Sequence, residues 1–115
     1  MKRTSNHPPA LAGVRRHAGE AARLLKALGN DQRLQVLCAL LGGPRSVGGI
    51  NASVPLSQSA LSQHLGVLRA AGVVTTERQA QTVYYALVPG PALAILKVLY
   101  RAYCASGAPI RIAPP

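Results

Sequence analysis

A proline between two short helical segments is the feature that most constrains the fold of this chain. Pro55 restricts Val54 to extended geometry, so a helix cannot continue through this point. Ser46 is suited to cap a helix that runs to about Ser53, and Ser57 is suited to cap the next helix. The sequence therefore predicts two helices joined by a short turn.

The helix that starts at Ser57 and ends before Gly72 has two sides of opposite character. At about 100° per residue, Leu61, Leu65 and Leu68 fall within one narrow stripe that should pack inward. The opposite side is small or hydrogen-bonding, with no bulky apolar residue: Ser59, Ser62, Gln63, Gly66, Arg69 and Ala70. A solvated face usually prefers Glu and Lys, which are both missing here, so this side is expected to meet a polar surface at close range.

Two β-prone runs follow, over residues 73–76 and 82–87, with residues 77–81 between them, so a β-hairpin is expected. Tyr84 and Tyr85 are neighbours on the second strand, so their side chains point to opposite faces of the hairpin. One of the two is expected in the core, and neither is given a binding role. Helix, turn, polar-faced helix and hairpin together form a winged helix-turn-helix, whose second helix enters the major groove of DNA. Short side chains let that helix approach the groove floor, where Ser and Gln exchange hydrogen bonds with bases and phosphates.

Two more helices are predicted before the turn. The first covers residues 18–28, where Leu24, Leu25 and Leu28 have helical spacing, and Gly29 ends it. Asn30 is suited to cap the second, in which four residues at helical spacing are expected to face the core: Leu34, Leu37, Cys38 and Leu41.

The last predicted helix, over residues 92–105, is apolar nearly all round. One face holds Leu93, Leu96, Tyr100, Tyr103 and Cys104, and the other holds Ile95, Val98, Leu99 and Ala102. Such a helix is unusual on the surface of a small monomer, which favours a dimer interface. A compatible alternative is that the N-terminal helix covers it.

The charge of the chain favours a polyanionic partner. Lys and Arg number 13 against 3 acidic residues, a net charge of +10, so nucleic acid is the leading partner. A basic surface that only aids solubility, or a basic helix on a membrane surface, are alternatives that charge alone leaves open. No apolar run is long enough to span a membrane and residues 1–16 lack the apolar centre of a secretory signal, so the cytoplasm is the expected compartment.

Two stretches resemble the ArsR/SmtB family of bacterial winged-helix repressors: "KALGNDQRLQVLCALL" and "LSQSALSQHLGVLRAAGVVTTERQAQTVYYAL". The resemblance covers about residues 22–87 and implies a homodimer, paired through its first and last helices, that binds an inverted-repeat operator in double-stranded DNA and releases it when an inducer arrives. The expected fold is mainly α with a small β-hairpin, in the order α-α-α-α-β-β-α. Residues 17–106 are expected to form the DNA-binding and dimerisation domain, with a flexible basic arm over residues 1–16 and a flexible tail over residues 107–115.

The same resemblance assigns DNA-binding residues. The segment matching the family's recognition helix contains Ser57, Gln58, Ser59, Ser62, Gln63 and His64, and Arg78 matches a wing residue able to reach phosphate or the minor groove. His64 lies close to the apolar stripe, so packing between helices is as good an interpretation as DNA contact. Gly66 stands where relatives often have Lys, so DNA affinity is expected either to be modest or to depend on Arg69, Arg78 and the basic arm.

Metal sensing, common in this family, is the second interpretation. Arsenic and cadmium sensors carry a CxC-type pair in the third helix, where this chain has "SVGGINA". Zinc sensors carry Asp and His on the last helix, where this chain has Leu, Ala, Lys and Tyr. No metal ligand or other cofactor is therefore assigned; His7 and His17 are expected to be solvated.

The two cysteines, Cys38 and Cys104, lie 66 positions apart, which matches neither a CxxC redox motif nor a zinc-finger spacing. By default they are buried packing residues. Their contexts, "VLC" and "LYRAYC", resemble the dithiol subgroup of the family that includes BigR, SqrR and HlyU. That resemblance implies that Cys38 and Cys104 sense persulfides or oxidants by becoming bridged, as a disulfide or through extra sulfur atoms.

Two other functions remain to be weighed. An antirepressor or activator of the HlyU type is the alternative within DNA binding. A thiol oxidoreductase is disfavoured, and no enzyme activity is expected, because the chain has no nucleophile and base pair, Gly-rich phosphate loop or CxxC motif.

Overall fold

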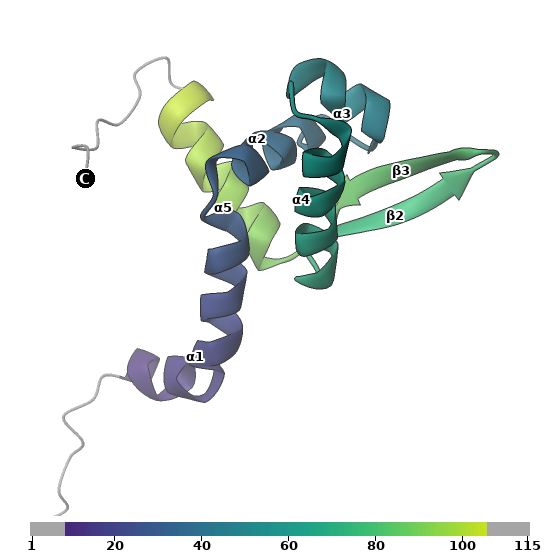
Figure 1. The fold of residues 1–115 in the computed structure, drawn as a ribbon. Coiled ribbons are helices and arrows are strands. Elements are labelled where there is room, and N and C mark those ends of the chain that lie inside the picture. Colours follow the sequence, from purple (N-terminus) through teal and green to yellow (C-terminus); the bar gives the residue numbers. More distant parts are fainter. Residues whose placement is uncertain (1–8, 106–115) are drawn as a thin grey trace, which may run out of the picture.

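Helices build most of this molecule, and a small sheet projects from one side (Figure 1). The computed structural model describes residues 9–105. Its elements, in chain order, are α1 (Pro9–Leu28), α2 (Asp31–Leu40), β1 (Arg45–Ser46), α3 (Val47–Ser53), α4 (Gln58–Ala70), β2 (Val74–Gln79), β3 (Thr82–Leu87), α5 (Pro91–Tyr100) and a π-helical turn, η1 (Arg101–Ala105). This is the predicted winged helix-turn-helix. Over the described range, no helix is long and apolar enough to cross a lipid bilayer.

The first helix is longer than the sequence analysis predicted. It begins at Pro9 instead of near Ala18, so residues 9–16, assigned to a flexible arm, are helical. A kink at His17 (φ −120°, ψ 17°) separates them from the rest of α1, and Figure 1 shows this first part turned aside. All residues from 9 to 23 are exposed, so no core contact marks this segment in the sequence. Residues 1–8 and the predicted tail 107–115 lie outside the described residues.

Three predicted helix caps are confirmed. The side chain of Asn30 accepts a hydrogen bond from the backbone nitrogen of Arg33 at the start of α2. Ser46 and Ser57 do the same at the starts of α3 and α4, each at 3.1 Å. Each cap stabilises its helix by about 1 kcal/mol and fixes the residue at which it begins.

The core lies where α2, α4 and α5 meet. The predicted stripe of α4 is confirmed, because Leu61, Leu65 and Leu68 are all fully buried. The prediction for α2 is confirmed for Leu37, and Leu34 and Leu41 pack against the core while partly exposed, but it was wrong for Cys38. The buried residues of α2 are Val36, Leu37 and Leu40, and Cys38 is exposed.

The sheet has one strand more than predicted. Strands β2 and β3 pair from Val74 opposite Leu87 to Gln79 opposite Thr82, so β2 runs further than expected and leaves a two-residue turn. The short strand β1 pairs with β3 on its other edge, so the sheet order is β1-β3-β2. As predicted, one of the adjacent tyrosines, Tyr85, packs against the core.

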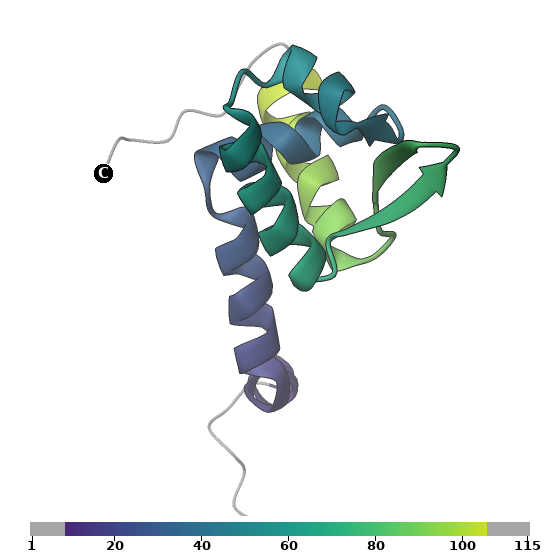
Figure 2. The same cartoon turned by 45° about the vertical axis from the view of Figure 1, so that its right-hand side comes forward.

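Much of α5 has no cover within one protomer. Ala92 and Leu96 are buried, but Val98 is 54% exposed and Tyr100 48% exposed. The N-terminal helix does not cover this side: α1 packs its C-terminal part against α2 and α4 and then runs away from the body (Figures 1 and 2). The apolar surface of α5 is therefore available to a partner.

Candidate DNA-reading and thiol sites

The side of α4 that faces away from the core is exposed along its whole length. As predicted, its exposed residues include Ser59, Ser62, Gln63, Gly66, Arg69 and Ala70. A Cβ added at Gly66 would meet nothing within 4 Å, so no part of the described chain shields this face. The backbone of α4 can therefore approach a surface as closely as its short side chains allow.

The N-terminal end of α4 gathers small polar groups. Ser57 caps the helix, and its Oγ lies 3.4 Å from Oγ of Ser59. Gln58, the first helical residue, is exposed. Backbone N–H groups and the positive end of the helix dipole point the same way, so this end suits a phosphate or an acceptor on a base.

The turn that presents α4 is held by a residue that the sequence analysis did not single out. The side-chain nitrogen of Asn51 donates to the carbonyl oxygens of Val54 (3.0 Å) and Leu56 (2.8 Å). These two bonds fix the residues on both sides of Pro55, so the angle between α3 and α4 is set within the turn. An asparagine four residues before Pro55 was the sequence feature that could have indicated this turn.

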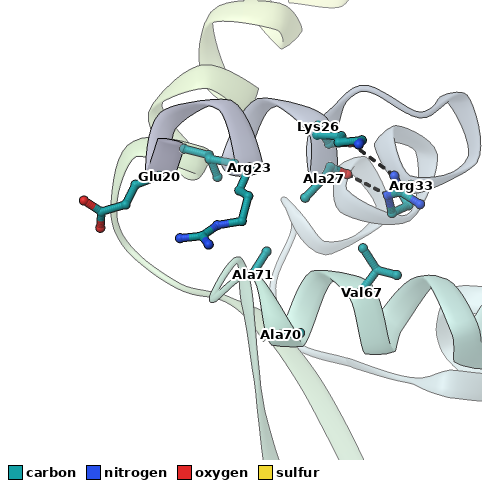
Figure 3. A pocket seen from close by; sticks show the side chains of 9 residues that line it. Glu20, Arg23, Lys26, Ala27, Arg33, Val67, Ala70 and Ala71 are labelled. Carbon is teal, nitrogen blue, oxygen red and sulfur yellow. Dashed lines mark hydrogen bonds between the residues drawn. The ribbon is translucent and has the colours of Figure 1, made fainter. Parts of the chain in front are cut away.

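A second hydrogen-bonded group joins α4 to the first two helices. Arg33 donates to the carbonyl oxygens of Ala27 (2.6 Å) and Lys26 (3.2 Å), which end α1 (Figure 3). Its Nη1 also lies 3.4 Å from Nδ1 of His64 on α4. Because a guanidinium can only donate, Nδ1 of His64 accepts, and its Nε2 then donates to Gln32 Oε1 at 2.9 Å.

This arrangement places His64 differently from the other residues of the predicted DNA-binding set. The ring is half-buried and both of its nitrogens bond to α2, which is the packing arrangement that the sequence left open. Arg33 and Gln32 were missed by the sequence analysis, because 31 and 32 positions separate them from His64 and no local pattern connects them.

The hairpin carries the second candidate DNA surface. Arg78 is exposed on β2 opposite Val83, two residues before the turn. The turn itself contains Ala80 with φ at +56°, a left-handed conformation that a residue with a Cβ adopts at a cost. Arg78 therefore lies near the tip of a narrow hairpin that projects from the body (Figure 1).

The structure brings the two cysteines to one cavity. It has a volume of about 560 Å³ and is lined by Cys38, Leu41, Gly42, Lys97, Tyr100, Arg101 and Cys104. Cys38 comes from α2 and Cys104 from the turn η1 at the end of α5, which packs on α2. Both are free thiols with exposed side chains in the single protomer, so they are not the buried packing residues that cysteines are by default.

The surroundings of Cys38 favour its neutral form. Although much of the Cys38 side chain is exposed, the protein atoms around the thiol partly desolvate it and raise its pKa above the ordinary value, and negative charge on Cys104 raises the pKa further. Both causes agree with the position of the two thiols on the wall of one cavity. Within the part of the chain that the structure covers, no three His, Cys, Asp or Glu side chains are grouped as a metal site would need.

Comparison with known proteins identifies the family. A family model described as bacterial regulatory protein, arsR family, matches residues 30–76, from the cap of α2 into β2. The transcriptional activator HlyU of Vibrio cholerae is 45% identical over 97 residues, which are 84% of this chain and 90% of that protein. The chain belongs to the ArsR family. A second relative, the biofilm growth-associated repressor of Agrobacterium fabrum, is 41% identical over 83% of this chain and 81% of its own length.

Solved structures of ArsR-family proteins have the same fold. Reduced HlyU from Vibrio cholerae matches with a TM-score of 0.77 over 83% of this chain and all of that chain. The transcriptional repressor BigR from Xylella fastidiosa matches with a TM-score of 0.73 at 37% identity, over 82% of this chain and 96% of that one. A Mycobacterium bovis domain described as a homodimeric winged helix-turn-helix DNA-binding domain shares the fold at 24% identity, over 85% of this chain and 88% of that one, with a TM-score of 0.68. The family model and the relatives at 45% and 41% identity show that this chain is a transcriptional regulator of the DNA-binding ArsR family, and the solved structures show its winged-helix fold.

Proposed function

We propose that this regulator is a homodimeric repressor that binds its operator when Cys38 and Cys104 are free thiols and releases it when they are bridged. The observation that carries the proposal is that both sulfur atoms line one cavity, although they are far apart in the sequence. Cys38 is on the helix that supports α4, and Cys104 follows α5, whose exposed apolar side suits a dimer interface. A bridge therefore links the dimer interface to the helix that supports the recognition helix α4.

The dimer is supported by two exposed apolar surfaces. Val98, Tyr100 and Tyr103 are exposed on α5 and its last turn, and Leu25 is 57% exposed on α1. On α1, Ala18, Ala21 and Leu25 are exposed at helical spacing, so they form one stripe. A two-fold dimer through these helices places two copies of α4 on one duplex, where successive major grooves are about 34 Å apart.

DNA contact is assigned to the exposed side of α4 and to the wing. Ser57, Gln58, Ser59, Ser62 and Gln63 suit base edges and phosphates, and Arg69 and Arg78 suit phosphates. We assign His64 to positioning α4, because both ring nitrogens are engaged with α2.

The bridge forms from two thiols and a sulfur or oxygen oxidant. Because its raised pKa makes Cys38 less often a thiolate than an ordinary cysteine, we assign the first attack to Cys104. A small persulfide transfers its outer sulfur to Cys104, which becomes a persulfide, and the rest of the donor leaves as a thiol. Cys38 then attacks the inner sulfur, which is that of Cys104, so that a disulfide forms and the outer sulfur leaves as hydrogen sulfide. With a hydroperoxide, Cys104 becomes a sulfenic acid and Cys38 displaces water.

The test needs an operator, which selection from a random duplex library by the reduced protein supplies. We expect the selected sequence to be an inverted repeat, and persulfide treatment to release it from the native protein in a mobility assay. The double variant Cys38→Ser, Cys104→Ser should bind like the reduced protein and ignore persulfide. Intact mass of the treated native protein then separates a disulfide from a bridge with extra sulfur atoms. If the double variant is also released by persulfide, the two cysteines are not the sensor.

A second candidate is activation by displacement of another DNA-binding protein, favoured because one 45%-identical relative is named a transcriptional activator. The position of the selected site in a promoter distinguishes the two. A site that overlaps the polymerase site supports the repressor, and a site shared with a silencing protein supports the activator.

A further inference from the structure

A groove between α1 and α4 combines an apolar floor with unpaired positive charge (Figure 3). It has a volume of about 690 Å³, within the range of about 300–1,000 Å³ that small-molecule sites occupy. The floor and walls are lined by five apolar residues: Leu24, Ala27, Val67, Ala70 and Ala71. Three cationic residues, Arg23, Lys26 and Arg33, complete the lining together with Glu20.

The charges in this groove do not cancel. Glu20, the one carboxylate of the lining, is hydrogen-bonded to His17 at 2.8 Å and points away from the cavity in Figure 3. Three of the five N–H donors of Arg33 bond to two carbonyls and to His64. Arg23 has no hydrogen-bond or ion-pair partner among the described residues, and Figure 3 shows it extending above Ala71, over the floor.

Dimerisation through α1 leaves this groove open. Arg23 and Leu25 are two positions apart, which is about 200° around an α-helix, so they lie on opposite sides of α1. The exposed stripe with Ala18, Ala21 and Leu25 is therefore turned away from the groove.

We propose that this groove binds a small organic anion with an apolar body, such as an aromatic or aliphatic carboxylate or sulfonate. The apolar part lies against Val67 and Ala71, and the anionic group pairs with Arg23 and Lys26. Such an occupant touches α1 and α4 at once, so its affinity depends on the position of the recognition helix, and by linkage it changes the affinity for DNA. The site contains neither cysteine and does not rest on the thiol chemistry proposed above.

The test uses 8-anilinonaphthalene-1-sulfonate, whose fluorescence rises in apolar surroundings, and its uncharged analogue N-phenyl-1-naphthylamine. Both are titrated into the full chain carrying Cys38→Ser and Cys104→Ser, so that the result is independent of the thiols. We expect one sulfonate per protomer, bound at least about tenfold more tightly than the neutral analogue, a difference of about 1.4 kcal/mol. Equal affinity for the two probes would show that charge plays no part and would overturn the proposal.

Three variants locate the probe. Arg23→Gln removes the unpaired charge, and Ala71→Glu places a carboxylate beneath it; each should weaken sulfonate binding about tenfold. Arg16→Gln removes an equal charge from an exposed position of α1 outside the groove and should change nothing. Circular dichroism checks that each variant is folded. If Arg23→Gln and Ala71→Glu both bind like Arg16→Gln, the probe lies elsewhere and the proposal is wrong.

Discussion

The two regions that connect the recognition helix to the rest of the molecule are built on opposite principles. Between α1, α2, α3 and α4, the side chains of Asn51, Arg33 and His64 make hydrogen bonds to backbone carbonyls and to one another. We call these three residues and their bonds the frame. The cavity between α2 and α5 instead holds two free thiols with no covalent link. The frame holds α4 in place, and the cavity is where the proposed bridge would change the support of α4.

The difference indicates how a small regulator combines sequence reading with switching. Reading a groove demands that α4 be presented at one angle, which a set of satisfied hydrogen bonds provides. The proposed switch requires a contact between helices that a reaction can change, and the oxidant must be able to reach it. An exposed cavity between α2 and α5 that contains two thiols allows this, whereas a filled hydrophobic core would exclude the oxidant. Loss of the frame should impair DNA binding in both thiol states, whereas changes to the cavity should affect only the difference between them.

The largest effect is expected from Arg33→Ala. It removes three hydrogen bonds that connect α1, α2 and α4, and should lower the free energy of unfolding by about 2–3 kcal/mol in urea titrations. Because α4 loses its anchor, affinity for the selected operator should fall by about tenfold or more in reduced and bridged protein alike.

The salt dependence of binding distinguishes this role from direct DNA contact. Loss of one phosphate contact reduces the slope of log K against log salt by about 0.9, whereas loss of a positioning residue leaves the slope unchanged. Arg78→Ala, on the wing, is the matched variant expected to reduce it. A reduced slope for Arg33→Ala would mean that Arg33 binds DNA and that the frame does not explain its effect.

Asn51→Ala should have the next largest effect. Two donated bonds to carbonyls of the turn are lost, so the free energy of unfolding should fall by about 1.5 kcal/mol. Asn51→Asp has nearly the same shape but cannot donate, and it directs negative charge at both carbonyl oxygens, so it should destabilise more than Ala does. If Asn51→Asp is as stable as the native protein in the same urea titration, the side chain does not hold the turn through its amide.

The sequence predicted the helix caps and the buried side of α4 but not the frame, because the interactions differ in their range along the chain. Caps at Asn30, Ser46 and Ser57 are local signals, and so is the stripe Leu61, Leu65, Leu68, since its spacing allows only one buried side. Of the frame's bonds, those of His64 join residues more than thirty positions apart, and the others cross the connections between α1 and α2 or between α3 and α4, so no helical or strand periodicity predicts them.

The placement of Cys38 on α2 was the error with the most consequence. Both the predicted stripe with Leu34 and Leu41 and the observed one with Val36 and Leu40 share Leu37 and fit a helical period. The choice between them depends on where α4 and α5 pack, which the sequence of α2 does not contain. The observed rotation brings Cys38 to the surface, and that exposure is what makes a thiol switch chemically accessible.

Gly66→Ala tests whether the outer face of α4 is independent of both regions. Gly66 is in the middle of a helix, and its added Cβ would meet nothing within 4 Å. The variant should raise the free energy of unfolding by about 0.5–1 kcal/mol, because alanine loses less backbone entropy in a helix. The ratio of operator affinities in reduced and bridged protein should stay unchanged. A changed ratio would show that the outer face takes part in the switch.

The smallest effect, and the one most specific to the cavity, concerns the reactivity of Cys38. Its pKa is raised first by burial and second by the charge of Cys104, so at a given pH fewer Cys38 side chains are thiolates than for an ordinary cysteine. The rate of alkylation by iodoacetamide should therefore reach its midpoint at a pH above the ordinary value of 9.0. Cys104→Ser removes the second cause and leaves the first, so the midpoint should move down without falling below the ordinary value.

Trypsin separates the two cysteines into different peptides, since Arg45 and Arg101 lie between them, and mass spectrometry of the Cys38 peptide follows the reaction. If Cys104→Ser leaves the pH midpoint of Cys38 alkylation unchanged, the two sulfur atoms do not influence each other, and this result would contradict a thiol switch in the cavity.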